Sequence, residues 1–265
     1  YKRQQGVIMM KILAAFDSFK ESMTAYAAGE AVQRAYNNVH ICPLADGGEG
    51  TMEVMNRYLH GDIHEIEVAG PLFKTVHAKL AIMDDLAIIE SAQACGLDYL
   101  TEEEKNGTEA TSYGVGEMMK YAYDHGVKRF LLTLGGSACN DGGIGLLSGM
   151  GYGFFDQFDQ RIPMNARGLE TLDHIKKTRL DLSSIEVEGA CDVTNPLCGK
   201  EGATYVFGPQ KKVKDLEKTD QAMKHYAKIM SELVDKDDSC VPGAGAAGGM
   251  GYAICLLYTS DAADE

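Results

Sequence analysis

The sequence has 265 residues, 45% of them hydrophobic, and a formal net charge of −14 at pH 7; this length suits one or two domains with a sizeable core. So acidic a balance argues against nucleic acid and anionic membrane surfaces as partners, because both require a basic face. The seven cysteines form no CxxC pair and the apolar runs are too short to span a bilayer, which favours a cytoplasmic chain with reduced thiols.

Strands and helices are expected to alternate in the first part of the chain. In order, the apolar spacing predicts a buried strand at 11–16, a helix at 24–36 capped by Thr24, a strand at 39–44 and a helix ending near Leu59. From residue 63 to residue 90 the pattern changes to shorter strand-like runs, separated by the turn signals GPLF and MDDL. These runs are 64–70 (HEIEVAG), 75–83 (TVHAKLAIM) and 86–91 (LAIIES).

The second part of the chain continues the alternation. The expected elements are a helix at 113–125, strands at 129–134, 185–191 and 203–208 (ATYVFG), and a charged helix at about 212–234. Strands that alternate with helices predict an α/β protein with parallel strand pairing. The change of pattern near Gly70 predicts a domain boundary there.

One loop is unusually rich in glycine. The segment LTLGGSACNDGGIGLLSGMG, residues 132–151, places Asn140 and Asp141 between two double glycines, after a predicted strand and before a helical pattern. Glycine lets backbone N–H groups approach a ligand closely. Such a turn before a helix N-terminus is typical of an anion site, usually for phosphate.

Three further polar loops follow predicted strands. FDSFKES follows the first strand, PLADGGEGT the second and CDVTNPLCG a later one, and each carries an aspartate. Ligands of open α/β sheets bind outside the carboxyl ends of the strands. Each loop alone is explained by common turn or helix-cap chemistry, but the four loops together favour a binding site.

These motifs resemble those of the type I glycerate kinases. DSFKESMTA, PLADGGEGT, GGSACNDGGIG, CDVTNPLCGKEGATYVFGPQK and PGAGAAGGMGYA occur here in the order seen in that family. The resemblance implies ATP-dependent phosphorylation of D-glycerate, with Mg²⁺, in a cleft between two α/β domains, and it favours 2-phosphoglycerate as the product. Two positions depart from the family: Cys139 replaces the usual threonine, and GPQKKV (208–213) lacks the usual glycine and alanine after Gln-Lys.

The resemblance also implies how the chain is divided. A Rossmann- or flavodoxin-like parallel sheet forms the first domain, incomplete here, and a second α/β domain is inserted into it. The expected ranges are 1–69 for the first part of domain one, 70–238 for the inserted domain and 239–265 for the start of the return to domain one. The sequence leaves the oligomeric state open.

Both ends of the chain resemble translated sequencing adaptor. Residues 255–265 (CLLYTSDAADE) resemble one strand of a transposase adaptor in frame, and residues 1–4 (YKRQ) resemble the opposite strand. We therefore expect a natural chain from about Gln5 to about Ile254 that is cut short, since the family continues through a further Gly-Glu-Gly-Arg motif. A cleft missing one wall cannot position both substrates, so we expect little or no kinase activity and reduced solubility from residues 1–265 alone.

Phosphoryl transfer to a hydroxy acid requires cations or amides for the anions, a metal held by carboxylates, and a proton acceptor. The candidate metal ligands are Asp46, Asp141 and Asp192, and the candidate catalytic residues are Asp192, Asp141 and Lys20. Which aspartate acts as the base stays open; Asp192→Asn and Asp141→Asn are each expected to slow turnover by ~10²–10⁴-fold with little effect on folding. The candidate substrate- or phosphate-binding residues are Asp17, Ser18, Gly47, Gly48, Gly135, Gly136, Ser137, Asn140, Asn195 and Lys211, with Gln210 no better than a turn residue.

Two other functions fit parts of the sequence. GAGAAG, residues 243–248, formally matches the dinucleotide fingerprint of NAD-dependent dehydrogenases, but the charged segment DKDDSCVP before it is not strand-like. A non-catalytic glycerate-binding module would keep the carboxylate-binding loops and need no metal carboxylates. The sequence contains no GxxxxGK[ST] motif and no HRD or DFG set, which argues against P-loop kinases and protein kinases.

Overall fold

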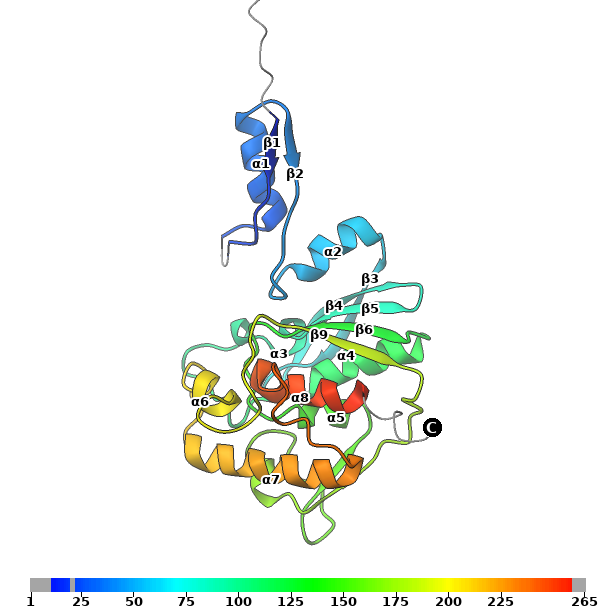
Figure 1. Ribbon diagram of the computed structural model, residues 1–265, viewed down its shortest axis with the longest axis vertical. Helices are drawn as coiled ribbons and strands as arrows, with labels where there is room; N and C mark the ends of the chain where they lie inside the picture. Colours follow the sequence, from blue (N-terminus) through cyan, green and yellow to red (C-terminus); the bar gives the residue numbers. More distant parts are fainter. Residues whose placement is uncertain (1–10, 20–21, 259–265) are drawn as a thin grey trace, which may run out of the picture.

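The structure of the chain, a computed structural model, describes residues 11–19 and 22–258 (Figure 1). The described chain begins with a small parallel unit, in which β1 (Ile12–Ala14) pairs with β2 (Val39–Ile41) and α1 (Ala25–Ala35) connects them. The side chain of Thr24 accepts a hydrogen bond of 3.2 Å from the backbone N–H of Ala27, as an N-cap does. The first two predicted strands and their capped helix are confirmed.

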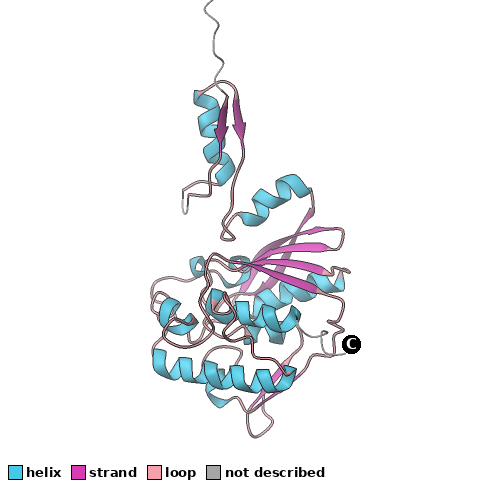
Figure 2. Ribbon diagram, viewed as in Figure 1, coloured by secondary structure: helices cyan, strands magenta, loops and turns pink. Residues whose placement is uncertain are grey.

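A five-stranded sheet forms the centre of the larger part of the molecule (Figure 2). Its strands, in spatial order, are β3 (Asp62–Ala69), β4 (Thr75–Met83), β5 (Leu86–Glu90), β6 (Arg129–Thr133) and β9 (Glu186–Ala190). The pairs β3–β4 and β4–β5 are antiparallel, whereas β5–β6 and β6–β9 are parallel. The sheet is therefore mixed, and the predicted parallel pairing holds for one half of it.

The strand β5 is buried on both faces of this sheet. On one face, Ile88 of β5 packs against Met52 of α2 (Thr51–Leu59). Its neighbours Ala87 and Ile89 point to the other face and join the main core, where α4 (Tyr113–Asp124) lies (Figure 1). Because successive side chains of a strand point to opposite faces, burial on both faces explains why β5 is a continuous apolar run.

The remaining elements surround the main core. They are α3 (Ala92–Cys95), the 3₁₀ helix η1 (Leu97–Tyr99), α5 (Ile144–Gly149), β7 (Gly153–Phe155), the 3₁₀ helix η2 (Gly168–Thr171), β8 (His174–Lys176), α6 (Ala203–Phe207), α7 (Leu216–Val234) and α8 (Ala246–Tyr258). The antiparallel pair formed by β7 and β8 was not predicted. In the described part of the chain, no helix combines the length and the apolar character needed to cross a membrane.

Residues 203–207 form helix α6, so the strand predicted at 203–208 is wrong. The helix buries two adjacent residues, Ala203 and Thr204, whereas a half-buried strand buries alternate residues. Thr204 Oγ1 also accepts a hydrogen bond of 2.9 Å from Asn140 Nδ2. Tertiary packing thus overrides the strand propensity of this short segment.

The charged helix α7 begins later than predicted. It starts at Leu216, and the side chain of Asp215 accepts a hydrogen bond of 3.0 Å from the N–H of Lys218 as its N-cap. Residues 208–212 form turns instead, and these turns bury Lys211. The later start of the helix therefore decides where this lysine lies.

The strand β3 belongs to the five-stranded sheet, because it pairs with β4 along its whole length from Asp62 to Ala69. The change of strand pattern therefore falls near Gly61, before the residue at which the domain boundary was predicted. The division into two domains remains a prediction, and we propose that its boundary lies between α2 and β3.

Replacement of Gly116 by alanine is expected to destabilise the protein by roughly 1–3 kcal/mol. A Cβ on Gly116 of α4 would lie 2.2 Å from the carbonyl oxygen of Leu146 in α5 and 2.8 Å from Cα of Gly149. These are backbone atoms, so relief of the contact requires the two helices to move apart. The midpoint of urea denaturation measures the effect.

The matched control is Gly126→Ala. A Cβ there meets no atom within 4 Å, and the residue has a φ of 87°, so only the left-handed backbone is strained, at a cost of about 1 kcal/mol. A midpoint for Gly116→Ala equal to that of the parent chain would contradict the close contact between α4 and α5.

Candidate active site

The four polar loops meet at one cavity of about 500 Å³. Its lining comes from the loops after β1, β2, β6 and β9, with further residues from α3, η1 and the turns after α6. The predicted residues that line it are Asp17, Ser18, Asp46, Gly47, Gly48, Gly135, Gly136, Ser137, Asp192, Gln210 and Lys211. The structure thus brings most of the predicted site residues together at the carboxyl ends of their strands.

Glycines allow these loops to approach one another closely. A Cβ on Gly135 would lie 2.9 Å from Cα of Gly48, and one on Gly47 would lie 3.1 Å from the carbonyl oxygen of Ala190. Gly47 also has a φ of 90°, in the left-handed region that favours glycine. The loops after β2, β6 and β9 therefore pack backbone to backbone beside the cavity.

Carboxylates lie at the more exposed part of the cavity, which we call its mouth and define by Asp17, Asp46 and Asp192. Asp46 Oδ1 accepts a hydrogen bond of 2.8 Å from the N–H of Gly48, and Asp17 Oδ1 accepts one of 2.6 Å from the N–H of Ser18. Asp192 is exposed, and its side chain has no hydrogen bond or ion pair within the described chain. Its carboxylate is therefore available to a ligand.

A buried lysine lies in the least exposed part of the cavity lining, which we call its floor and define by Lys211 and Ser137. Lys211 is 2% exposed, and its Nζ donates hydrogen bonds to Ser137 Oγ at 2.9 Å and to the carbonyl oxygen of Cys139 at 2.6 Å. Burial lowers the pKa of this ammonium group. An interaction with the Cys95 side chain, together with burial, raises the pKa of the Cys139 thiol.

Asp141 does not line the cavity. Its carboxylate is buried; Oδ2 accepts hydrogen bonds from Ser112 N (2.8 Å) and Ser112 Oγ (2.9 Å), and Oδ1 accepts one from Gly143 N (3.0 Å). Burial raises the pKa of this carboxyl, and these hydrogen bonds oppose the rise. The structure therefore places Asp141 where it fixes its loop to the start of α4, outside the lining of the cavity.

The side chains of Asn140 and Asn195 are likewise outside the cavity lining. Asn140 donates to Thr204, as described above, and Asn195 Nδ2 donates to the carbonyl oxygen of Glu201 at 2.7 Å. The second double glycine also serves packing, because a Cβ on Gly143 would lie 2.5 Å from Cβ of Ala253. Only the first half of the glycine-rich loop, Gly135 to Ser137, reaches the cavity.

The described residues contain no cluster of three His, Cys, Asp or Glu side chains placed to hold a metal ion. Asp46 and Asp192 line the same cavity. Mg²⁺ is commonly held by one or two carboxylates together with substrate phosphates, so these two aspartates fit that role and Asp141 does not. Lys20, predicted as a catalytic residue, lies outside the described residues.

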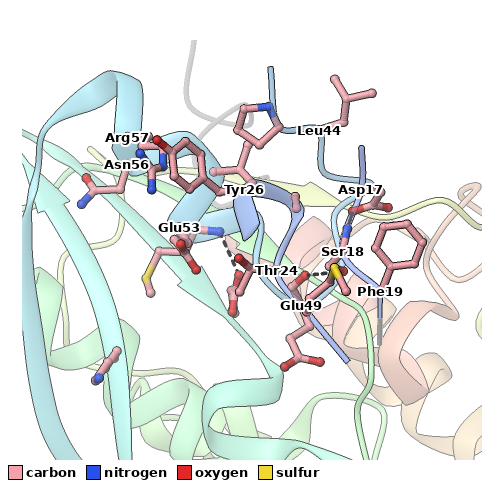
Figure 3. Close-up of a pocket in the computed structure, with 18 of the residues that line it drawn as sticks. Asp17, Ser18, Phe19, Thr24, Tyr26, Leu44, Glu49, Glu53, Asn56 and Arg57 are labelled. Atoms are coloured by element: carbon pink, nitrogen blue, oxygen red, sulfur yellow. Dashed lines mark hydrogen bonds between the residues drawn. The ribbon is translucent and has the colours of Figure 1, made fainter. Parts of the chain in front are cut away.

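A second cavity, of about 750 Å³, adjoins the first (Figure 3). Its lining includes residues of α1, α2 and the sheet, and Asp17, Ser18 and Glu49 line both cavities. In it, Cζ of Arg57 lies 3.3 Å from the ring centre of Tyr26. Sequence analysis missed this cavity because many of its side chains come from α1, α2 and the strands of the sheet, whose apolar patterns carry no signal of a site.

Glu90 is the buried acid of the second cavity. It is the last residue of β5, and its Oε1 accepts a hydrogen bond of 2.8 Å from the N–H of Met52 in α2. Burial raises the pKa of its carboxyl. A carboxylate near a helix N-terminus is favourably placed, so Glu90 joins α2 to the sheet.

The GAGAAG segment, residues 243–248, does not follow a strand as a dinucleotide fingerprint does. Residues 235–245, before α8, contain no strand, although a Rossmann fingerprint follows one. A Cβ on Gly245 would lie 2.3 Å from the carbonyl oxygen of Pro196, and one on Gly248 would lie 2.2 Å from that of Cys139. These glycines therefore allow backbone packing against the loops after β9 and β6.

Comparisons with known proteins agree with the motif order. The sequence model of the Glycerate kinase family matches residues 12–263. A glycerate kinase of Haemophilus influenzae is 40% identical over 260 residues, covering 94% of this chain and 69% of that protein. The glycerate 2-kinase of Escherichia coli is 38% identical over 264 residues, covering 95% of this chain and 69% of that protein. A crystal structure assigned as glycerate kinase 2 from Salmonella typhimurium LT2 matches with a TM-score of 0.83 and 39% identity, covering 94% of this chain and 70% of that one.

The comparisons do not support the adaptor interpretation of residues 255–265. The family match extends to residue 263. Residues 255–258 complete α8, in which Leu256 and Leu257 are each 1% exposed and belong to the main core. The other adaptor-like residues, 1–4 and 259–265, lie outside the described chain.

Proposed function

The chain belongs to the glycerate kinase family, and we propose that it transfers a phosphoryl group from ATP to the 2-hydroxyl of D-glycerate. The observation that carries this proposal is the cavity where four motifs of the family meet. It combines carboxylates at its mouth with a buried ammonium at its floor, which are groups that phosphoryl transfer to an acid requires. Similarity to the glycerate 2-kinase of Escherichia coli supports the 2-hydroxyl as the acceptor.

We assign the proton-accepting role to Asp192. Its carboxylate is exposed at the mouth without a partner in the described chain, so it can accept a proton from a substrate hydroxyl without first breaking an internal hydrogen bond. Asp46 is the second carboxylate of the mouth, and the two would hold Mg²⁺ together with the phosphates. Bound Mg²⁺ supplies positive charge that offsets the charge of the phosphates.

Backbone amides of the glycine loops support phosphate binding. The N–H groups of Gly47, Gly135 and Gly136 border the cavity and donate to no acceptor within the described chain. Successive unpaired N–H groups in a turn form a concave site for anions. We propose that these three amides receive the transferred phosphate, with Ser18 beside them at the mouth.

The test is a coupled assay of ADP release with D-glycerate and Mg·ATP, with the product identified by phosphorus NMR. We expect glycerate-dependent ADP release and 2-phosphoglycerate as the product. A 3-phosphate product would overturn the 2-hydroxyl as the acceptor, whereas no glycerate-dependent release from either this chain or the extended chain would overturn the kinase assignment. Because low activity of residues 1–265 alone stays a prediction, the assay compares this chain with one extended by the part that the relatives have in addition.

Other properties of the protein remain proposals. We propose a cytoplasmic location, which the seven free cysteines support. We expect no nucleic acid partner, because the net charge is −14. The non-catalytic alternative predicts glycerate binding without ADP release, so the same assay separates it from the kinase.

A further inference from the structure

Lys211 is a buried cation without a counter-ion in the described part of the chain. Its two hydrogen-bond acceptors, Ser137 Oγ and the carbonyl oxygen of Cys139, are neutral. Within the described chain no carboxylate lies within ion-pair distance of its Nζ. Asp141 is the one carboxylate among the groups that raise the pKa of Lys211, after Cys139 and Cys95, but that carboxylate accepts its hydrogen bonds from Ser112 and Gly143.

The buried ammonium group of Lys211 lacks part of the compensation that a buried charge needs. Removing a charge from water is unfavourable unless an opposite charge and hydrogen bonds compensate for it. An ammonium group has three N–H donors, and only two of those of Lys211 have acceptors. Because Lys211 lines the cavity, an anion that enters the cavity supplies both the missing charge and the third acceptor.

The depth of Lys211 indicates which anion this is. The cavity mouth is acidic, since Glu49 and Asp98 also line it and are exposed. A nucleotide polyphosphate requires a metal cation beside such carboxylates, so its place is at the mouth. A small monoanion fits the floor, where a single ammonium and a hydroxyl are 2% and 3% exposed.

We propose that Lys211 and Ser137 bind the carboxylate of the D-glycerate substrate. This proposal rests on the proposed function and names the part of the site that recognises the acid. A carboxylate at the floor leaves the hydroxyl groups of glycerate on the side of the mouth, where Asp192 and the glycine amides lie. Lys211 then orients the acceptor, and the phosphate of the nucleotide approaches from the mouth.

The test measures the binding of D-glycerate and of Mg·ATP separately by calorimetry. For Lys211→Met, we expect the affinity for D-glycerate to fall roughly 10- to 100-fold, as loss of a charged hydrogen bond predicts, and the affinity for Mg·ATP to stay within about threefold. Ser137→Ala keeps the ammonium group, so its affinity for D-glycerate is expected to fall only about three- to tenfold. The melting temperature of each variant reports whether it folds.

A second measurement does not depend on the folding of the methionine variant. Because burial lowers the pKa of Lys211, the affinity of the unmodified protein for D-glycerate falls as pH rises through that pKa. The titratable groups that face Lys211 are Cys95, Cys139 and Asp141. Lys211→Arg keeps its charge over this range, so its affinity for D-glycerate is expected to change little with pH.

Three results would overturn the proposal. Loss of Mg·ATP affinity with unchanged D-glycerate affinity in Lys211→Met would place a phosphate at the floor. Equal loss of both affinities, with a lower melting temperature, would make Lys211 a structural residue. An affinity of the unmodified protein for D-glycerate that stays constant up to pH 10.5, the ordinary pKa of lysine, would show that the ammonium group does not bind the substrate. If the unmodified protein neither binds nor phosphorylates D-glycerate, the proposed function itself fails.

Discussion

Asp192→Asn is expected to lower the rate of phosphoryl transfer by roughly 10²–10⁴-fold, the usual loss when a catalytic acid or base is removed. The side chain is exposed at the mouth of the cavity and has no partner in the described chain, so its replacement breaks no hydrogen bond or ion pair among the described residues. The melting temperature is therefore expected to stay within error of that of the parent chain. Steady-state kinetics and a thermal melt measure the two quantities on the same sample.

Calorimetry with Mg·ATP then distinguishes the two roles of this carboxylate. A proton acceptor acts during the chemical step, so its loss lowers kcat and leaves the affinity for Mg·ATP unchanged. A metal ligand also contributes to binding, so its loss weakens that affinity. The matched control is Asp62→Asn, at the exposed start of β3, for which we expect parental kinetics. Near-normal turnover of Asp192→Asn would show that Asp192 is neither the proton acceptor nor a metal ligand.

Asp141→Ala is expected to destabilise the protein by roughly 3–5 kcal/mol, because it leaves several buried donors without an acceptor. Those donors are the N–H and hydroxyl of Ser112 and the N–H of Gly143. They lie where the glycine-rich loop meets the start of α4, so the loss also loosens the loop that carries Gly135 and Ser137. The midpoint of urea denaturation measures the stability, and the slope tests two-state unfolding.

Ser112→Ala is the matched comparison for this prediction. It removes one of the three donors to Asp141 together with the acceptor of the Leu146 N–H, so a smaller loss of about 1–2 kcal/mol is expected. An unchanged midpoint for Asp141→Ala together with a large loss of turnover would restore the catalytic role that the sequence predicted. A large loss of stability would agree with the position that the structure gives this carboxylate.

Local patterns in the sequence determined most of the secondary structure. The strand predicted at 75–83 has the bounds of β4, Thr75–Met83, and Thr24 caps α1 as predicted. Both signals depend on residues a few positions apart, and such short-range preferences act before any tertiary contact is made. The position of the four loops after strands also predicted a shared site, because ligands of α/β sheets bind outside the carboxyl ends of the strands. That the loops come from two separate sheets, after β1 and β2 and after β6 and β9, was seen only in the structure.

Only the tertiary structure decided which polar side chains face that cavity. Asp141 and Asp192 belong to equally polar motifs, yet one carboxylate is buried against Ser112 and the other is exposed at the mouth. Lys211 is buried because turns at 208–212 delay the start of α7, and residues 203–207 are helical because Ala203 and Thr204 pack into the core. In each case the outcome depends on partners distant in the sequence, since burial and hydrogen bonding are set by the elements that pack around a residue and not by its neighbours along the chain.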